Sequence, residues 1–285
     1  LKARYTMHLL KRSANKDADM EKVLEYVNNS FESAEEQAAF DVYDANNINP
    51  LYGFFVARAG LGASESMRSK LAEYNDPRLS RAFITKQGTS GKEQAPGTAD
   101  NAVYAPNGTP EQGTSQYGTS LFMYSISAPT LLLSYHELLF LKAEALVRLN
   151  RVNDASDALK SAMVAAFDNF NNSVKSSLAS PKLNSTKIRT TTPTNGIIGV
   201  SKVDGAVAET YFNAEVKTMF DANPLKEVMV QKYLAFYGAS GESFEAYNDY
   251  RRCKGLGETF VELKNPLNSN QFPLRLPYGS DDVLA

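Results

Sequence analysis

Histidine and cysteine, the residues that most often ligate metals or act as nucleophiles, are scarce in this sequence. It contains two histidines, His8 and His136, and one cysteine, Cys253. The stretch HELLF, which begins at His136, places Phe140 where a zinc protease helix needs its second histidine. We therefore interpret His136 as a residue of a helix face, and Cys253 as no nucleophile, because no histidine is near it in sequence. The sequence predicts no metal site and no other cofactor.

Motifs for phosphate binding and covalent catalysis are missing as well. GASGES at Gly238 lacks the lysine of a P-loop, and GLGASE at Gly60 does not complete a dinucleotide fingerprint. No Gly-x-Ser-x-Gly run marks a serine nucleophile. Adjacent carboxylates such as Glu35 and Glu36 diverge on a helix, whereas a glycosidase needs two carboxyl groups either about 5 to 5.5 Å or about 6.5 to 9.5 Å apart. We predict that the protein is not an enzyme, with a glycosidase as the alternative of that class.

The best candidate for a ligand site is the segment from Arg81 to Tyr124, whose centre is dense in Gly, Thr, Ser, Pro and Asn. Long irregular segments often carry function. Its tyrosine rings are expected to be exposed and to offer flat apolar faces to a ligand, while amide and charged groups bond polar groups of the ligand. The expected ligand-binding residues are Arg81, Asn101, Tyr104, Asn107, Gln116, Tyr117 and Tyr124. The alternative is that these residues only fill a surface loop.

Composition and charge limit the kinds of partner. The chain has 285 residues, of which 43% are hydrophobic and 22% charged, enough to bury a large core. The formal net charge is -2, and the longest basic cluster is Arg251, Arg252 and Lys254. No global positive field attracts a phosphate backbone, so we predict that nucleic acid is not a partner.

A helical hairpin is predicted at 131–170. Small and large apolar residues fall at the spacing of one tetratricopeptide unit, a pair of packed antiparallel helices. The residues that carry this spacing are Leu139, Ala143, Leu146, Ala155, Leu159 and Ala162. Charged residues such as Glu137 and Lys142 interrupt the apolar run Leu131 to Leu149, which is therefore interpreted as the most buried helix and not as a membrane span. Glu144 and Arg148, one turn apart, are expected to pair on a narrow polar face.

Further helices are expected on both sides of this hairpin. Three helical stretches are predicted within 1–43, with Ala3, Met7, Leu10, Val23, Leu24 and Val27 facing inward. Ser64 to Tyr74 is predicted as a helix that ends before Pro77. A second long loop is predicted from Asn171 to Thr194. Together these periodicities predict one mostly α-helical domain over 1–285.

The stretch YLAFYGASGESFEAYNDYRR, from Tyr233 to Arg252, holds six aromatic rings in two helical segments. Gly238 can end the first segment in a left-handed conformation, and Ser240 or Ser243 can cap the second. Aromatic stripes at helical spacing are usually part of the core. Phe244 and Tyr247 are therefore expected to pack into the scaffold and not to touch a ligand.

Five motifs in order give the sequence a family resemblance. They are NDPRL at Asn75, YHELLFLKAEAL at Tyr135, VMVQKYLAFYG at Val228, EAYNDYRR at Glu245 and FPLRLPY at Phe272. In this order they resemble the SusD/RagB family of outer-membrane nutrient-binding lipoproteins, in its SusD-like branch, over about Leu1 to Ala285. The resemblance also suggests that an N-terminal part is missing from the chain.

This resemblance implies an all-α fold, in which tetratricopeptide-like hairpins form a scaffold with long irregular loops on one face. It implies a protein on the surface of the outer membrane, held by a lipid anchor outside this chain. The implied partners are a glycan ligand and a SusC-like TonB-dependent transporter. The implied role of the stretch that ends in Arg251 and Arg252 is a fold signature. The sequence has no tryptophan, so its 15 tyrosines are the rings expected to stack on sugars.

Two other binding functions use the same scaffold. The first is peptide capture for uptake, which relies on backbone hydrogen bonds and end charges rather than on ring stacking. The second is a protein-interaction scaffold, because tetratricopeptide hairpins commonly present a groove to partner helices or tails. Calorimetry against glycans and peptides separates the first from glycan binding, and a groove without a loop-lined pocket favours the second.

Overall fold

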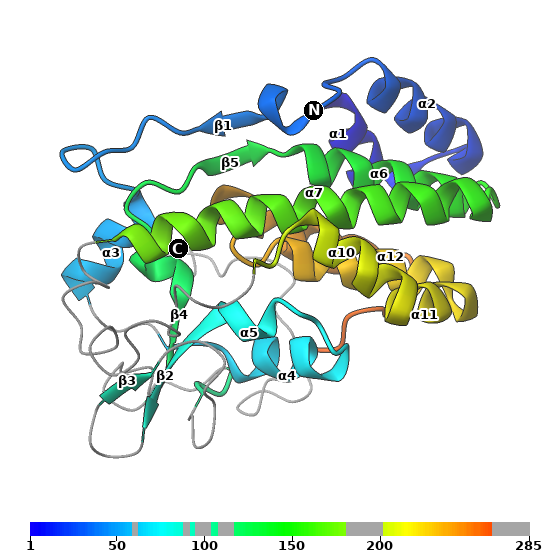
Figure 1. Ribbon diagram of the computed structural model, residues 1–285. Helices are drawn as coiled ribbons and strands as arrows, with labels where there is room; N and C mark the ends of the chain where they lie inside the picture. Colours follow the sequence, from blue (N-terminus) through cyan, green and yellow to red (C-terminus); the bar gives the residue numbers. More distant parts are fainter. Residues whose placement is uncertain (59–61, 88–91, 95–103, 108–116, 181–201, 264–285) are drawn as a thin grey trace, which may run out of the picture.

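A computed structural model of the chain describes residues 1–58, 62–87, 92–94, 104–107, 117–180 and 202–263 (Figure 1). Helices make up most of the described chain, so the predicted all-α class is confirmed. The helices are α1 (Lys2–His8), α2 (Lys16–Asn28), α3 (Pro50–Arg58), α4 (Glu65–Glu73), α5 (Leu79–Ala82), α6 (Tyr135–Arg148), α7 (Val152–Ala179), α10 (Gly205–Tyr211), α11 (Lys217–Ala222), α12 (Pro224–Ala235) and α13 (Ser243–Gly255).

Short turns and strands connect these helices. The turns are η1 (Leu10–Arg12), η2 (Ala34–Glu36), η4 (Leu121–Tyr124), η6 (Phe212–Val216), which has π geometry, and η7 (Ser240–Glu242). The strands are β1 (Ala38–Phe40), β2 (Phe83–Gln87), β3 (Lys92–Gln94), β4 (Thr119–Ser120) and β5 (Thr130–Leu133). These described strands pair antiparallel: β1 pairs with β5, and β2 lies between β3 and β4.

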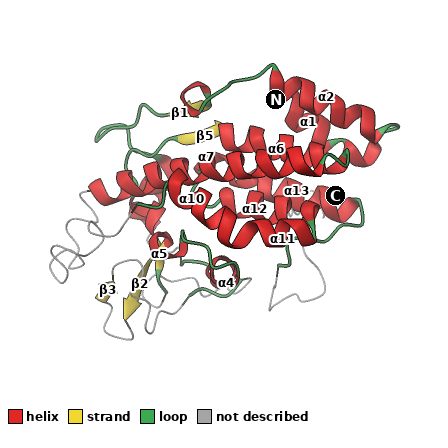
Figure 2. Cartoon of the chain, turned by 45° about the vertical axis from the view of Figure 1, so that its right-hand side comes forward, coloured by secondary structure: helices red, strands yellow, loops and turns green. Residues whose placement is uncertain are grey.

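The hairpin of α6 and α7 is the centre of the fold. In Figures 1 and 2, α1 and α2 lie on one side of it, and α10, α11 and α12 lie on the other. Ala143, Ala155 and Ala162 have no exposed surface, which lets the two helices approach closely. Ser134 caps α6 by accepting a hydrogen bond from the Glu137 backbone N–H at 3.1 Å. The tetratricopeptide-like hairpin is confirmed, and α6 buries ten of its fourteen residues.

The predicted boundaries need three corrections. Residues 31–43 do not form the expected third helix; they form the turn η2 and the strand β1, which pairs with β5. Residues 130–133 are that partner strand, so the helix predicted from Leu131 begins only at Tyr135. The loop predicted from Asn171 is helical as far as Ala179, because Phe170, Val174 and Ser177 continue the buried face of α7.

The predicted inward residues of the first two helical stretches are all buried. Glu144 and Arg148 pair as predicted, with 2.8 Å between Arg148 Nε and Glu144 Oε1. Their setting differs from the predicted polar face, because the side chain of Glu144 has no exposed surface. The reason is a second partner, Arg252 of α13, which brings this carboxylate into the interior.

The turn between α12 and α13 depends on one glycine. Gly238 has φ of +86°, the left-handed conformation that was predicted. A Cβ atom there would lie 2.6 Å from Cζ of Phe122, so the turn also needs the absence of a side chain. Ser243 is the first residue of α13 and not its cap, a position held by Glu242. Phe244 is 77% exposed, so the prediction that it packs into the scaffold is wrong.

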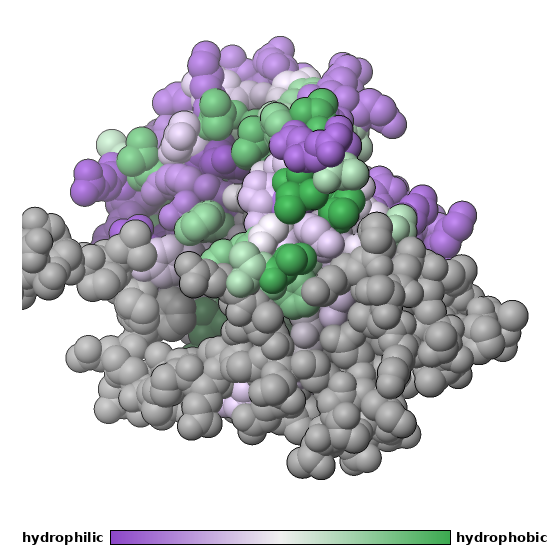
Figure 3. All heavy atoms as spheres, turned by 90° about the vertical axis from the view of Figure 1, so that its left-hand side faces the viewer, coloured by the Kyte–Doolittle hydropathy of each residue, from purple (hydrophilic) through white to green (hydrophobic). Residues whose placement is uncertain are grey.

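Apolar side chains are exposed on the segment that joins β1 to α3 and on α3 itself. Val42 is 66% exposed, Phe54 50% and Val56 45%. Figure 3 views the molecule from the side where α3 lies in Figure 1 and shows apolar residues among hydrophilic ones on that face. Among the described residues, no helix is both long and apolar enough to cross a bilayer.

Candidate functional site

The three tyrosines predicted to be exposed lie inside the protein. Tyr104 is 9% exposed, Tyr117 6% and Tyr124 1%. The ring of Tyr104 meets Phe83 edge-on with centroids 5.3 Å apart, and Tyr124 meets Phe55 at 5.0 Å. The expectation of exposed rings is therefore wrong, because α3, α4 and β2 pack around this segment and give the rings an apolar environment.

Of the polar residues predicted with them, the structure describes Arg81 and Asn107. Arg81 is buried, and burial lowers the pKa of its guanidinium to about 10. Asn107 is half-buried and accepts a hydrogen bond from Ser64 Oγ at 3.1 Å. Asn101 and Gln116 lie outside the described residues.

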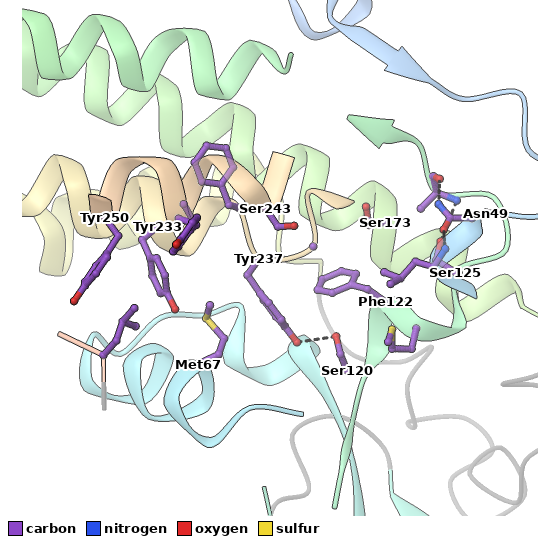
Figure 4. Close-up of a pocket in the computed structure, with 18 residues that line it drawn as sticks. Asn49, Met67, Ser120, Phe122, Ser125, Ser173, Tyr233, Tyr237, Ser243 and Tyr250 are labelled. Carbon is purple, nitrogen blue, oxygen red and sulfur yellow. Dashed lines mark hydrogen bonds between the residues drawn. The ribbon is translucent and has the colours of Figure 1, made fainter. Parts of the chain in front are cut away.

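A cleft of about 500 Å³ opens between the α12–α13 hairpin and the C-terminal end of the segment Arg81 to Tyr124 (Figure 4). This is the size of a small-molecule site. Six aromatic rings among the described residues line it, and we call it the aromatic cleft. These rings are Phe122, Tyr233, Phe236, Tyr237, Tyr247 and Tyr250. In Figure 4 the ring of Tyr233 extends from α12 toward Met67 of α4, and the ring of Tyr250 lies beside it on the side away from Met67.

Tyr237 joins the two walls of the aromatic cleft. Its hydroxyl donates to the carbonyl of Ala82 at 3.0 Å, and its oxygen lies 2.9 Å from Ser120 Oγ. Because the only hydroxyl proton of Tyr237 goes to Ala82, Ser120 must donate in the second bond. Burial raises the pKa of Tyr237, so this phenol stays neutral. The ring is held further by Phe122, with centroids 5.1 Å apart.

The rings of the aromatic cleft fall into a floor and a rim. Phe122 and Phe236 are 5% and 3% exposed and form the floor. Tyr233, Tyr237, Tyr247 and Tyr250 are half-buried. Tyr237 is held by the hydrogen bonds described above, so Tyr233, Tyr247 and Tyr250 form the rim. Aromatic faces with a polar tip suit ligands that are partly apolar and partly hydroxylated.

At the end of the aromatic cleft away from Tyr250, the polar side chains form hydrogen bonds with the backbone of the surrounding residues. Asn49 donates from Nδ2 to the carbonyl of Ala128 at 2.9 Å and accepts from the Leu51 N–H at 2.8 Å. Ser125 accepts from the Ala128 N–H at 3.0 Å. This end is therefore a rigid wall, and the half-buried tyrosines are the groups best placed to contact a ligand.

Two carboxyl groups do come together in the structure, but away from the cleft. Glu137 and Glu242 have fully buried side chains and share Arg4 as a partner. Burial and the neighbouring Glu137 raise the pKa of Glu242 to about 8. Neither lines the aromatic cleft, so this pair meets no substrate there. Among the described residues, no three His, Cys, Asp or Glu side chains form a group that could hold a metal ion.

Comparison with known proteins decides the family. A family model described as "Starch-binding associating with outer membrane", SusD-like, matches residues 1–279. The chain belongs to the SusD-like family. A solved SusD/RagB family protein from Bacteroides thetaiotaomicron is 52% identical with a TM-score of 0.86, over 99% of this chain and 57% of that chain. No curated protein matches the sequence significantly.

Solved structures of lower sequence identity share the fold. A SusD homolog from Bacteroides fragilis is 19% identical with a TM-score of 0.67, over 99% of this chain and 59% of that one. A chitin-binding protein is 20% identical with a TM-score of 0.63, over 99% of this chain and 57% of that one. The chain thus spans less than two thirds of the length of these relatives.

Five of the six rings of the cleft belong to the stretch Tyr233 to Arg252, whose helical spacing predicted a place in the core, and the sixth, Phe122, was not predicted. Tyr247 and Tyr250 were recognised as a stripe at helical spacing, which is the usual sign of a buried face. The charged residues next to them in the sequence, Arg251 and Lys254, indicate that this face of α13 is only partly buried. Arg251 lies 5.6 Å from the Tyr247 ring centre, and Lys254 lies 5.9 Å from that of Tyr250.

Proposed function

We propose that this SusD-like chain binds an oligosaccharide or polysaccharide nutrient in the aromatic cleft without chemically changing it. The bound glycan is then delivered to a SusC-like TonB-dependent transporter in the outer membrane. The observation that supports this most is the cleft of about 500 Å³ with the half-buried tyrosines Tyr233, Tyr247 and Tyr250 at its rim. The chitin-binding protein of the same fold is consistent with a sugar ligand.

The physical basis of the proposed binding is ring stacking in a partly dry site. A sugar presents C–H groups on its faces and hydroxyls at its edges, so a tyrosine can cover the face while polar groups meet the edges. Each stacked ring contributes on the order of 1 kcal/mol, by analogy with aromatic pairs. Several rings in one cleft give useful affinity without any chemical step.

The proposed location is the cell surface, on the outer membrane, through a lipid anchor outside this chain. Cys253 is not a candidate for that anchor. Its side chain is 6% exposed, and burial raises the pKa of its thiol to about 12, so neither access nor reactivity suits acylation.

Replacing the rim tyrosines should weaken glycan binding without unfolding the protein. We expect Tyr247→Ala and Tyr250→Ala each to raise the dissociation constant about fivefold, the equivalent of about 1 kcal/mol. Isothermal titration calorimetry against neutral glycans measures this. Phe244→Ala is the matched control, because Phe244 lies on the same helix, is 77% exposed and does not line the cleft.

Two results would contradict this assignment. Equal glycan affinity in the two tyrosine variants and in the Phe244 control would place the site elsewhere. Tight binding of peptides, with no binding of glycans, would favour the peptide-uptake alternative.

A further inference from the structure

Beside the aromatic cleft lies a second cavity of about 140 Å³, which we call the middle cavity. Tyr233, Ala246 and Tyr250 line both, so the two spaces share a wall. Two of the three charged side chains that line the middle cavity, Asp249 and Glu258, are paired with cations of the protein, and the third, Lys254, lies 5.9 Å from the Tyr250 ring centre. Asp249 Oδ2 lies 2.7 Å from Lys232 Nζ, and Glu258 accepts two hydrogen bonds from Arg148 at 2.9 and 2.8 Å. The two carboxylates of the middle cavity are therefore already neutralised by cations of the protein itself.

The middle cavity in turn adjoins a third space of about 650 Å³, which we call the polar cavity. Tyr233 and the segment 259–261 line both of them. Tyr233 thus lines all three spaces and stands at their junction. The opposite wall of the polar cavity is α4, whose Met67 faces the aromatic cleft while Ser66 and Ser69 line the polar cavity.

The chemistry of the polar cavity differs from that of the aromatic cleft. Its described lining has serine hydroxyls, the amide of Asn107, three carboxylates and two ammonium groups. The charged residues are Glu65, Lys70, Glu73, Lys226 and Glu262. Such mixed donors and acceptors suit hydroxyl groups, and the excess of carboxylates does not favour a polyanion.

We propose that the three spaces form one groove for an extended, neutral oligosaccharide chain. One part of the chain stacks in the aromatic cleft, the chain passes Tyr233, and its further sugar units place their hydroxyls in the polar cavity. This inference rests on the proposed function and adds the class of ligand: a linear, uncharged chain of several sugar units rather than a single sugar. Asn107, which was predicted from the sequence as a ligand-binding residue, contributes to the polar cavity in this arrangement.

The physical consequence is that affinity depends on chain length. A short oligosaccharide fills only the aromatic cleft. A longer one gains hydrogen bonds in the polar cavity after its first units have already lost their translational freedom, so the added units bind at little further cost. Substitutions in the polar cavity should therefore weaken the binding of long oligosaccharides and leave the affinity for short ones unchanged.

The test is calorimetry with a neutral linear series from the disaccharide to the hexasaccharide, and with an anionic hexasaccharide. We expect the neutral hexasaccharide to bind at least about fivefold more tightly than the shortest chain that binds. Lys226→Ala, which removes an exposed side chain, and Ser69→Leu, which fills space at an exposed position, should each remove most of that gain. Both should leave the affinity for the shortest binding chain unchanged. Lys217→Ala is the control, because Lys217 is an exposed lysine paired with Asp221 outside these cavities.

The outcomes separate this inference from the proposed function. Binding of short chains with no gain for longer ones, or a gain that survives both polar-cavity variants, overturns the extended groove and leaves glycan binding standing. Tighter binding of the anionic hexasaccharide overturns the neutral ligand class. Failure of every glycan to bind, with Tyr247→Ala without effect, overturns the proposed function and the groove together.

Discussion

Arg252→Ala is expected to lower the free energy of unfolding by about 3 to 5 kcal/mol, because it leaves a buried carboxylate without its main partner. The Arg252 guanidinium binds Glu144 in a two-point contact, Nη1 to Oε1 at 2.6 Å and Nη2 to Oε2 at 2.8 Å. Burial alone would raise the pKa of Glu144, but Arg252 and Arg148 outweigh it and hold the pKa low. Urea denaturation followed by circular dichroism measures the loss.

Two further variants make this prediction specific to the buried pair. Arg251→Ala is the matched control: the neighbouring residue is exposed and only lies over the Tyr247 ring, so we expect a loss below about 1 kcal/mol. The double variant Arg252→Met with Glu144→Gln removes both charges and should recover part of the stability. Equal losses at Arg251 and Arg252 would show that the buried network contributes little.

Stability should fall as the pH rises from about 6.5 to about 8, because Glu242 is protonated in the folded protein and ionised in the unfolded chain. Its pKa is about 8 in the fold, against an ordinary value of 4.5. A group with a raised folded pKa contributes stability that is present below the unfolded pKa and lost as the pH rises through the folded pKa. At about 1.36 kcal/mol per unit, the loss over this window is about 2 kcal/mol. Urea denaturation at a series of pH values measures it.

The surroundings of Glu242 explain why its pKa is raised although the guanidinium of Arg4 is nearby. Arg4 of α1 donates from Nε to Glu137 at 2.7 Å, but its Nη2 lies 3.5 Å from Glu242, so the cation serves mainly Glu137. From α6 and its cap, His136 lies 3.6 Å from Glu242, and the Ser134 N–H donates to it. Burial lowers the pKa of His136 to about 3, so His136 stays neutral in this window.

Glu242→Gln is the control for this pH dependence, since an amide still accepts from Ser134 but does not titrate. We expect its stability to be nearly constant from pH 6.5 to pH 8. A slope equal to that of the unmodified protein would assign the pH dependence to another group. Below pH 6.5 the sign changes for His136, whose lowered pKa removes stability as the pH falls.

Local periodicity was sufficient to predict the helices that pack along their whole length. The alanines at the interface of α6 and α7 and the inward residues of α1 and α2 follow a 3.6-residue period, so the sequence shows which side faces the core. The strands β1 and β5 were missed because each has only three or four residues, too few for an alternating pattern. Their pairing joins segments about 90 residues apart, and only the tertiary structure brings them together.

By itself, the sequence determined the family, the helical scaffold and the residues of the aromatic hairpin. It did not determine which rings are exposed, because exposure depends on what other segments pack over a ring. Phe244 and Tyr104 illustrate this. Phe244, which was expected in the core because of its helical spacing, is 77% exposed, and Tyr104, which was expected at the surface of a loop, is 9% exposed. α4 and β2 cover Tyr104, whereas no described segment covers Phe244. The aromatic cleft exists only where α12, α13, η4 and α4 meet, and no single stretch of the sequence contains that meeting point.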